Sequence, residues 1–195
     1  MSKGGAENAN ILPALERLAR LMRAGEHGGG LNPAQWEALR YLSRANRFSN
    51  SPVALARFLG STKGTVSQTI KALHRKGYIL KAAREGEKRS IALSLTDTGR
   101  EMLGIDPLAE FSKSIDGLRG KTARRLDKGL SELLAAELAR TKQPGFGVCA
   151  TCRNFRGESG GYHCSFFEAA LSDDDAGMIC VEHSTEILPP RRKPG

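Results

Sequence analysis

The chain has 195 residues, of which 39% are hydrophobic, and its 30 Lys and Arg outnumber 21 Asp and Glu to give a net charge of +9. This length fits one large domain or two small ones. The composition argues against a membrane protein, because no apolar run approaches the roughly 18 residues that span a bilayer and the first residues lack a signal-peptide core. We therefore expect a cytoplasmic protein.

The positive charge is concentrated in one part of the chain. Residues 1–142 carry 25 basic and 14 acidic side chains, whereas residues 143–195 carry 5 basic and 7 acidic ones. A strongly basic segment is the electrostatic signature of contact with nucleic acid phosphates. The sequence therefore divides into a basic part that resembles nucleic-acid binders and a tail of a different kind.

Two amphipathic helices are predicted near the start, after a flexible segment at residues 1–9. Residues 11–24 place an apolar stripe on one helical face; the stripe consists of Leu12, Leu15, Leu18, Ala19 and Met22. The glycine-rich residues 25–30 end this helix. The next helix begins with Asn32 as N-cap, Pro33 in the first turn and Gln35 completing a capping box. Its buried face carries Trp36, which we expect in the core.

Residues 55–76 have the pattern of a helix-turn-helix. Two short helices meet at residues 59–62, and in the second, at about 62–76, Val66, Ile70 and Leu73 share one face. Thr62 suits the N-cap and Gly77 suits the left-handed position that ends a helix. The other faces are polar. This arrangement predicts a recognition helix that is presented to DNA.

A β-hairpin is predicted directly after this helix, at about residues 78–95. Strand-like segments at 78–80 and 90–95 flank a polar loop rich in cations. From Arg57 to Arg89 there are nine Lys or Arg and two acidic residues. A basic loop beside a recognition helix is typical of a wing that lies along the minor groove or the phosphates.

The order of these motifs resembles the MarR-type winged-helix regulators over roughly residues 10–142. The resemblance rests on 55-LARFLG-60, 65-TVS-67, 76-KGYI-79, 87-EKRS-90 and 93-LSLTDTG-99. Two departures are Gly64, where the family often has proline, and 87-EKR-89, where it usually has Asp-Arg-Arg. The resemblance implies a homodimer that binds a pseudo-palindromic operator and usually represses transcription. A small-molecule effector is compatible with it.

The predicted DNA contacts lie on the recognition helix and the wing. Gln68 is the best base-reading candidate, because an amide pairs with two atoms of adenine, whereas the cations mainly neutralise phosphates. The full set comprises Thr62, Lys63, Thr65, Ser67, Gln68, Lys71, Arg75, Arg84, Lys88 and Arg89.

Two further helical regions follow the wing. One starts at residues 97–104, breaks at Asp106-Pro107 because proline lacks a backbone donor, and resumes through residues 111–118. The other spans residues 122–141 and carries a wide leucine stripe; its members are Leu126, Leu130, Leu133, Leu134 and Leu138. The stripe needs a cover, either the core of the same chain or a partner. The family resemblance favours a two-fold dimer interface, formed with the first helix and the helix after the wing.

All four cysteines lie in the predicted module at residues 143–183. Cys149 and Cys152 form a Cys-x2-Cys pair, and Cys164 and Cys180 follow at wider spacing. A segment of this size hardly builds a core without a metal or a partner, and four thiols in a reducing compartment are best explained as metal ligands. Four unrelated buried cysteines are the alternative. A redox Cys-x2-Cys would need a strand-helix context that this glycine-rich segment lacks.

The identity of the metal is less constrained. Zinc would use the Cys149–Cys152 pair with Cys180 and His183, which leaves Cys164 idle. An iron–sulfur cluster, 4Fe-4S or 2Fe-2S, would use all four thiolates and an aromatic shell. The spacing is similar to that of high-potential iron–sulfur proteins. We favour the cluster, keep zinc as the alternative, and leave open whether His163 or His183 replaces a cysteine.

The sequence as a whole predicts a mainly α protein with a small β-hairpin wing: a dimeric winged helix-turn-helix with a helical dimerisation region, a Cys-rich metal-binding tail and a disordered end at 184–195. We expect a DNA-binding regulator that senses redox or iron status, and no enzyme, because no acid/base cluster is present. Since Cys149 follows soon after Leu138, we hypothesise that the cluster acts through the dimer helix. The alternative is a ligand-responsive regulator with structural zinc.

Overall fold

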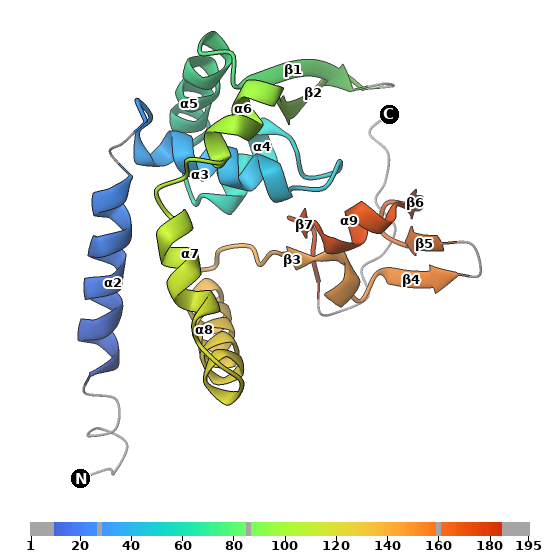
Figure 1. Cartoon of the computed structure of the whole chain (residues 1–195). Coiled ribbons are helices and arrows are strands. Elements are labelled where there is room, and N and C mark those ends of the chain that lie inside the picture. Colours follow the sequence, from blue (N-terminus) through green and yellow to red (C-terminus); the bar gives the residue numbers. More distant parts are fainter. Residues whose placement is uncertain (1–9, 27–28, 85–86, 159–160, 185–195) are drawn as a thin grey trace.

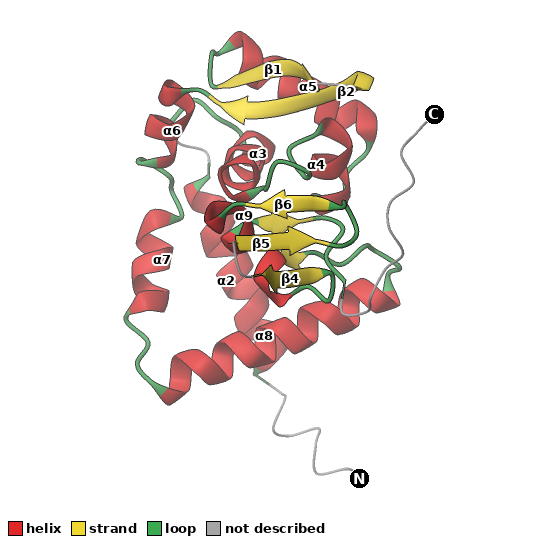
Figure 2. Ribbon diagram, turned by 90° about the vertical axis from the view of Figure 1, so that its right-hand side faces the viewer, coloured by secondary structure: helices red, strands yellow, loops and turns green. Residues whose placement is uncertain are grey.

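The computed structural model describes residues 10–26, 29–84, 87–158 and 161–184, with the side chains of 87–89 and 158 excluded. The predicted flexible residues 1–9 and nearly all of the predicted disordered end lie outside these ranges. The described chain is mainly helical and contains three small antiparallel sheets (Figures 1 and 2). Of its helices, none is both long and apolar enough to cross a membrane.

The winged helix-turn-helix forms as the sequence predicts. It consists of α3 (Pro33–Arg44), α4 (Pro52–Phe58), α5 (Lys63–Arg75), β1 (Ile79–Arg84), β2 (Glu87–Leu95) and α6 (Asp97–Leu103). The capping box is present: the Gln35 backbone N–H donates to Asn32 Oδ1 at 2.9 Å, and the Asn32 N–H donates to Gln35 Oε1 at 3.3 Å. Gly77 has φ +74°, as expected after α5.

The core of this unit lies around α3. Trp36, Leu39 and Tyr41 are fully buried, as are Leu55 of α4 and Leu73 of α5. The wing joins the same core, since Ile79 of β1 and Leu93 of β2 belong to this cluster. The Trp36 ring is thus a core group, as the sequence predicts.

Close packing fixes α6 against the start of the wing. Gly99 lies so near Tyr78 that a Cβ at this position would meet the Tyr78 carbonyl oxygen at 2.1 Å. The hairpin itself pairs Ile79 with Leu95 and Ala83 with Ile91, and its register shifts beyond Ala83. The absence of a side chain at Gly99 therefore sets the distance between α6 and the wing.

Three helices extend away from the winged helix. They are α2 (Ile11–Gly25), α7 (Ala109–Asp116) and α8 (Lys121–Arg140), and the predicted break at Asp106-Pro107 separates α6 from α7. Both views place α8 at the end of the molecule opposite α5 and the wing (Figures 1 and 2). No residue of these three helices is buried. The leucine stripe of α8, which was predicted to need a cover, is largely exposed in the single chain.

The tail forms short strands around one small helix. Its elements are β3 (Gly147–Val148), the 3-10 turn η1 (Cys149–Thr151), β4 (Phe155–Glu158), β5 (Gly161–Cys164), β6 (Ala169–Leu171), α9 (Asp173–Gly177) and β7 (Ile179–Cys180). Strand β3 pairs with β7, and β4, β5 and β6 form a meander. Ile179 and Val181 belong to the core of the winged helix. The tail is therefore packed onto the winged helix.

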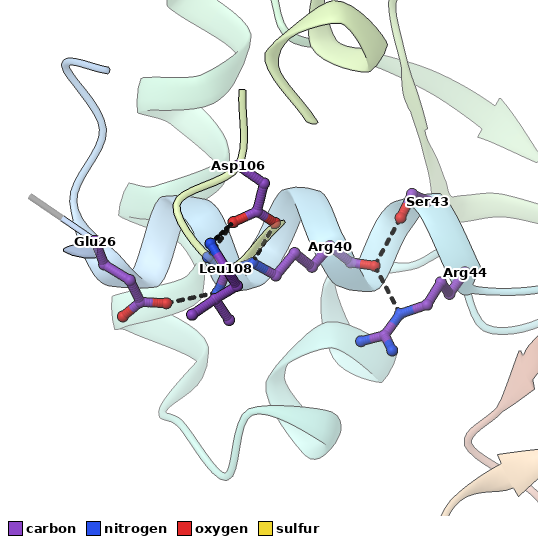
Figure 3. Close-up of polar contacts among 6 residues, drawn as sticks. All are labelled: Glu26, Arg40, Ser43, Arg44, Asp106 and Leu108. Carbon is purple, nitrogen blue, oxygen red and sulfur yellow. Dashed lines mark hydrogen bonds and ion pairs between the residues drawn. The ribbon is translucent and has the colours of Figure 1, made fainter. Parts of the chain in front are cut away.

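A charged network joins the extending helices to α3. Arg40 donates from Nε and Nη2 to the two carboxylate oxygens of Asp106, both at 2.7 Å, and from Nη1 to Glu26 at 2.5 Å (Figure 3). Burial alone would raise the pKa of Asp106, but hydrogen bonds from Arg40 and the Leu108 N–H outweigh it and lower this pKa. The sequence marked Asp106 only as part of a helix break, and no local pattern linked it with Arg40 and Glu26.

We predict that Arg40→Ala lowers the free energy of unfolding by about 2 kcal/mol, because it leaves Glu26 and Asp106 without their cation in a largely buried position. The neighbouring Arg44→Ala should change it by less than about 0.5 kcal/mol, since Arg44 is exposed. Urea denaturation followed by circular dichroism measures both. Equal effects of the two substitutions would contradict the structural role of Arg40.

Candidate DNA-binding surface and cysteine pocket

The predicted DNA contacts of α5 form one exposed surface. Val66, Thr69, Ile70 and Leu73 face inward and are buried. Every predicted contact on the opposite side is exposed; the set is Lys63, Thr65, Ser67, Gln68, Lys71 and Arg75, with the N-cap residue Thr62 beside it. The surface combines hydroxyl, amide and cationic groups, which suits contact with base edges and phosphates.

The N-terminus of α5 is held by its capping residue. Thr62 Oγ1 accepts a hydrogen bond from the Thr65 backbone N–H at 3.1 Å and lies 2.9 Å from Thr65 Oγ1. Both hydroxyls thus take part in starting the helix. Gln68 and Lys71, one and two turns further on, remain the more direct candidates for reading bases.

The wing residues differ in their surroundings. Arg84, at the end of β1, is half-buried, and its Nη2 donates to Asn50 Oδ1 at 2.6 Å. Lys88 and Arg89 belong to β2, but their side chains lie outside the described part of the structure. DNA contact by these three residues remains a prediction.

All four cysteines line one small pocket. Cys149 and Cys152 bound the η1 turn, Cys164 ends β5 and Cys180 ends β7. They are free thiols, and all except the half-buried Cys152 are buried. The rest of the lining is mainly apolar; it consists of Asn154, Phe155, Phe166, Phe167, Leu171 and Glu182. The fold thus brings together four sulfurs that lie up to 31 positions apart in the sequence.

Nitrogen donors approach the sulfurs of Cys149 and Cys152. Asn46 Nδ2 lies 3.2 Å from Cys149 Sγ, and the Ser184 backbone N–H donates to Cys152 Sγ at 3.4 Å. Asn154 Nδ2 lies 3.8 Å from Cys152 Sγ. Such donors stabilise negative charge on sulfur, which is the form in which cysteine binds metals.

Cys149 and Cys180 share a hydrogen bond, and this bond separates their pKa values. The bond from Cys149, supported by the Glu182 backbone N–H, lowers the pKa of Cys180 although burial acts in the opposite direction. The same bond, together with burial and the charge of Cys180, raises the pKa of Cys149. Cys180 is therefore the thiol of this pair that loses its proton first.

Neither tail histidine lines the pocket within the described residues. His183 Nε2 lies 3.0 Å from Thr151 Oγ1, and the His183 ring covers Gly147 so closely that a Cβ there would meet it at 2.8 Å. His163 lies in β5, between Arg156 of β4 and Ala170 of β6. No group of three or more His, Cys, Asp or Glu side chains in the described ranges is arranged to hold a metal ion.

Residues 29–90 match the sequence model of a family described as MarR family. This segment, about a third of the chain, is similar to the MarR family and folds as a winged helix. The match runs from the residues before α3 into β2 and includes all but the last of the motifs that carried the resemblance, 93-LSLTDTG-99. Among proteins of curated function, none matches the chain.

Solved structures of this kind share the fold of the MarR-like part. A MarR transcriptional regulator from Methanosarcina mazei Go1 has a TM-score of 0.55 at 20% identity, and the match covers 66% of this chain and 96% of that one. The S. aureus MepR–DNA complex has a TM-score of 0.53 at 18% identity, covering 63% and 95%. Streptococcus pneumoniae FabT in complex with DNA has a TM-score of 0.51 at 22% identity, and the match covers 67% of this chain and 94% of that one. About a third of this chain lies outside each match.

Sequence analysis missed the residues of the MarR-like winged helix that hold the tail in place. Arg57 Nη1 of α4 pairs with Glu182 at 2.6 Å, and its Nη2 donates to the Val181 carbonyl at 3.2 Å. Asn46 and Ser49 bind the tail from the connection between α3 and α4. The one available signal was the polar composition of 46-NRFSNS-51 between two helices. Cys149 thus contacts the α3–α4 connection, whereas the sequence had suggested a link through α8.

Proposed function

We propose that this protein is a homodimeric, sequence-specific DNA-binding transcriptional regulator whose tail binds an iron–sulfur cluster, and that the cluster modulates its affinity for DNA. The observation that carries DNA binding is the exposed polar and cationic face of α5 on a MarR-family winged helix. Two structures with the same fold, MepR and FabT, were solved with DNA. Repression is the expected outcome when a dimer occupies an operator.

The recognition helix and the wing should contribute differently to DNA binding. With a duplex selected from a random library by the wild-type protein, Gln68→Ala should cost about 1–3 kcal/mol and relax preference at one base position in each half-site. Arg89→Ala should weaken binding to all duplexes and lower the slope of log affinity against log salt by about 0.9 per phosphate lost. Fluorescence anisotropy measures both; altered base preference in Arg89→Ala would refute the wing assignment.

The exposed apolar stripes support a dimer. Leu126, Leu130, Leu133 and Leu134 of α8 are each between 41% and 48% exposed, and Leu12 and Leu21 of α2 are exposed further. A contiguous apolar surface of this kind marks an interaction site. A second copy is the occupant we propose, because the helices that carry the stripes lie opposite the DNA-binding end, which leaves both recognition helices accessible (Figure 2).

A charge in this stripe should separate the subunits. Leu130→Asp should convert the dimer to monomers and weaken operator binding at least about tenfold, since a monomer contacts one half-site only. Ala135→Asp is the matched control, because it adds the same charge at an exposed position on the opposite side of α8. Sedimentation velocity measures the oligomeric state of both variants, and a Leu130→Asp protein that stays dimeric would rule out this interface.

The chemistry of the cysteine pocket supports the cluster. Its donor set is four thiols, three of its six other lining residues are phenylalanines, and N–H groups approach Cys149, Cys152 and Cys180. These are the features that bind iron–sulfur clusters, shield them and tune their potentials. When bound, the cluster would supply a one-electron redox centre. The zinc alternative with His183 as ligand is less favoured, because His183 lies against Gly147 and Thr151 whereas Cys164 lines the pocket.

Metal analysis distinguishes these alternatives. Protein purified without oxygen should be brown, with iron and sulfide in matching amounts, and Cys164→Ser should lose most of both. His183→Ala should retain them. A colourless wild-type protein with one zinc per chain, lost in His183→Ala and kept in Cys164→Ser, would refute the cluster and establish a structural zinc site.

A further inference from the structure

The connection between α3 and α4, residues 45–51, separates the cysteine pocket from the wing. Its first residue forms a parallel bridge with β7, because Ala45 pairs with Ile179 and the Asn46 N–H donates to the Ile179 carbonyl at 3.0 Å. Its last residue, Ser51, is the N-cap of α4. One short segment therefore contacts the tail and begins the helix-turn-helix.

Asn46 is the member of this connection closest to the sulfurs. It is fully buried, and its Nδ2 lies 3.2 Å from Cys149 Sγ, while its Oδ1 accepts from the Phe48 backbone N–H at 3.1 Å. The amide is thus held in one orientation, with its donor directed at the sulfur. An N–H donor at this distance interacts more strongly with a metal-bound thiolate than with a thiol.

Two more residues of the connection, Phe48 and Ser49, contact the pocket wall and the tail. The Phe48 ring stacks on Phe167, a lining residue, with centroids 4.2 Å apart and planes within 8°. Ser49 is fully buried, and its Oγ accepts from the Val181 backbone N–H at 3.1 Å. A shift of the pocket wall must therefore move residues 46–49, because interiors are close-packed.

The next residue, Asn50, binds the wing with both its backbone and its side chain. Its carbonyl accepts from the Leu93 N–H of β2 at 2.7 Å, and its Oδ1 accepts from Arg84 Nη2 of β1 at 2.6 Å. Arg84 is one of the predicted phosphate contacts. Five consecutive residues thus connect the sulfur of Cys149 with a cation of the wing.

We propose that the α3–α4 connection is part of the cysteine site, with Asn46 as a positioning residue for Cys149, and that Asn50 transmits occupancy of that site to the wing through Arg84. This inference rests on the proposed function, because it assumes a cluster that modulates DNA affinity. It replaces the route through α8 with a shorter one inside each subunit. If a bound cluster were lost, Cys149 would take up a proton from solvent and become a neutral thiol, which would bind the Asn46 amide less strongly and allow Asn50 and Arg84 to change position.

The measurement is the ratio of DNA affinities of the cluster-loaded and cluster-free protein for the selected duplex. We expect a ratio of about tenfold in the wild type, within the usual range of coupling between sites. Asn50→Ala removes the acceptor for Arg84 but keeps the pocket, so the ratio should fall to within about twofold of one. The visible spectrum and the melting temperature show whether this variant still loads its cluster and folds.

A matched pair of wing variants tests the same route without relying on Asn50→Ala alone. Arg84→Gln and Lys81→Gln each delete one cation from β1, and both should weaken DNA binding in both forms. Only Arg84 binds Asn50, so only Arg84→Gln should also abolish the difference between the two forms. Asn46→Asp, an acceptor in place of the donor, should lower the reduction potential of the cluster without preventing its assembly.

The outcomes separate the two proposals. A tenfold ratio in the wild type that persists in Asn50→Ala and Arg84→Gln would overturn this route and leave regulation by the cluster standing. A ratio of one in fully loaded wild-type protein would overturn regulation itself, and the route with it. A normal potential in Asn46→Asp would exclude Asn46 from the site.

Discussion

The packing of α3 is the constraint on which the rest of the structure depends. Six of its twelve residues are buried, and the wing, α4, α5 and α6 all contact it. A helix covered on several sides must be apolar over a wide arc, so any polar group there needs a partner. Arg40 pairs with two carboxylates, one directly after α2 and one shortly before α7, and this network holds the end of α2 and the start of α7 against α3.

The C-terminal end of α3 organises the cysteine pocket in the same way. The tail has a small core of its own, made of three cysteines and Leu171 with a few half-buried phenylalanines. So few apolar groups hardly offset the entropy of ordering the segment. The tail gains the rest by adding Ile179 and Val181 to the core of the winged helix and by bonding to residues 45–49. A bound metal centre would further stabilise the folded tail.

In the proposed regulator, this attachment determines the path by which a change at the cysteine site would affect DNA binding. A route through α8 would need a change in the spacing of two subunits, with the short connection at 141–146 as the link. The contacts of Cys149 and Val181 lead instead into the α3–α4 connection, which is in contact with the wing and with the N-cap of α4. A close-packed segment bonded on both sides passes on a displacement, whereas a linker absorbs it.

The sequence by itself determined the local structure of the winged helix. Apolar periodicity predicted α5 and its exposed face, Asn32 and Thr62 marked N-caps, and Gly77 marked a C-terminus, because these signals depend on residues within one or two turns. The spacing of the four cysteines also predicted that they act together. The difference in charge between residues 1–142 and 143–195 showed that the chain has two parts of different kinds.

Only the tertiary structure decided how the parts meet. Asn46, Arg40 and Arg57 are ordinary polar residues in the sequence, and each becomes important through partners 66 to 125 positions away. Whether a polar group is buried, and against what, depends on long-range packing that no local pattern encodes. The same reason explains why His183 was a ligand candidate by spacing, whereas the fold directs its ring to Gly147 and Thr151.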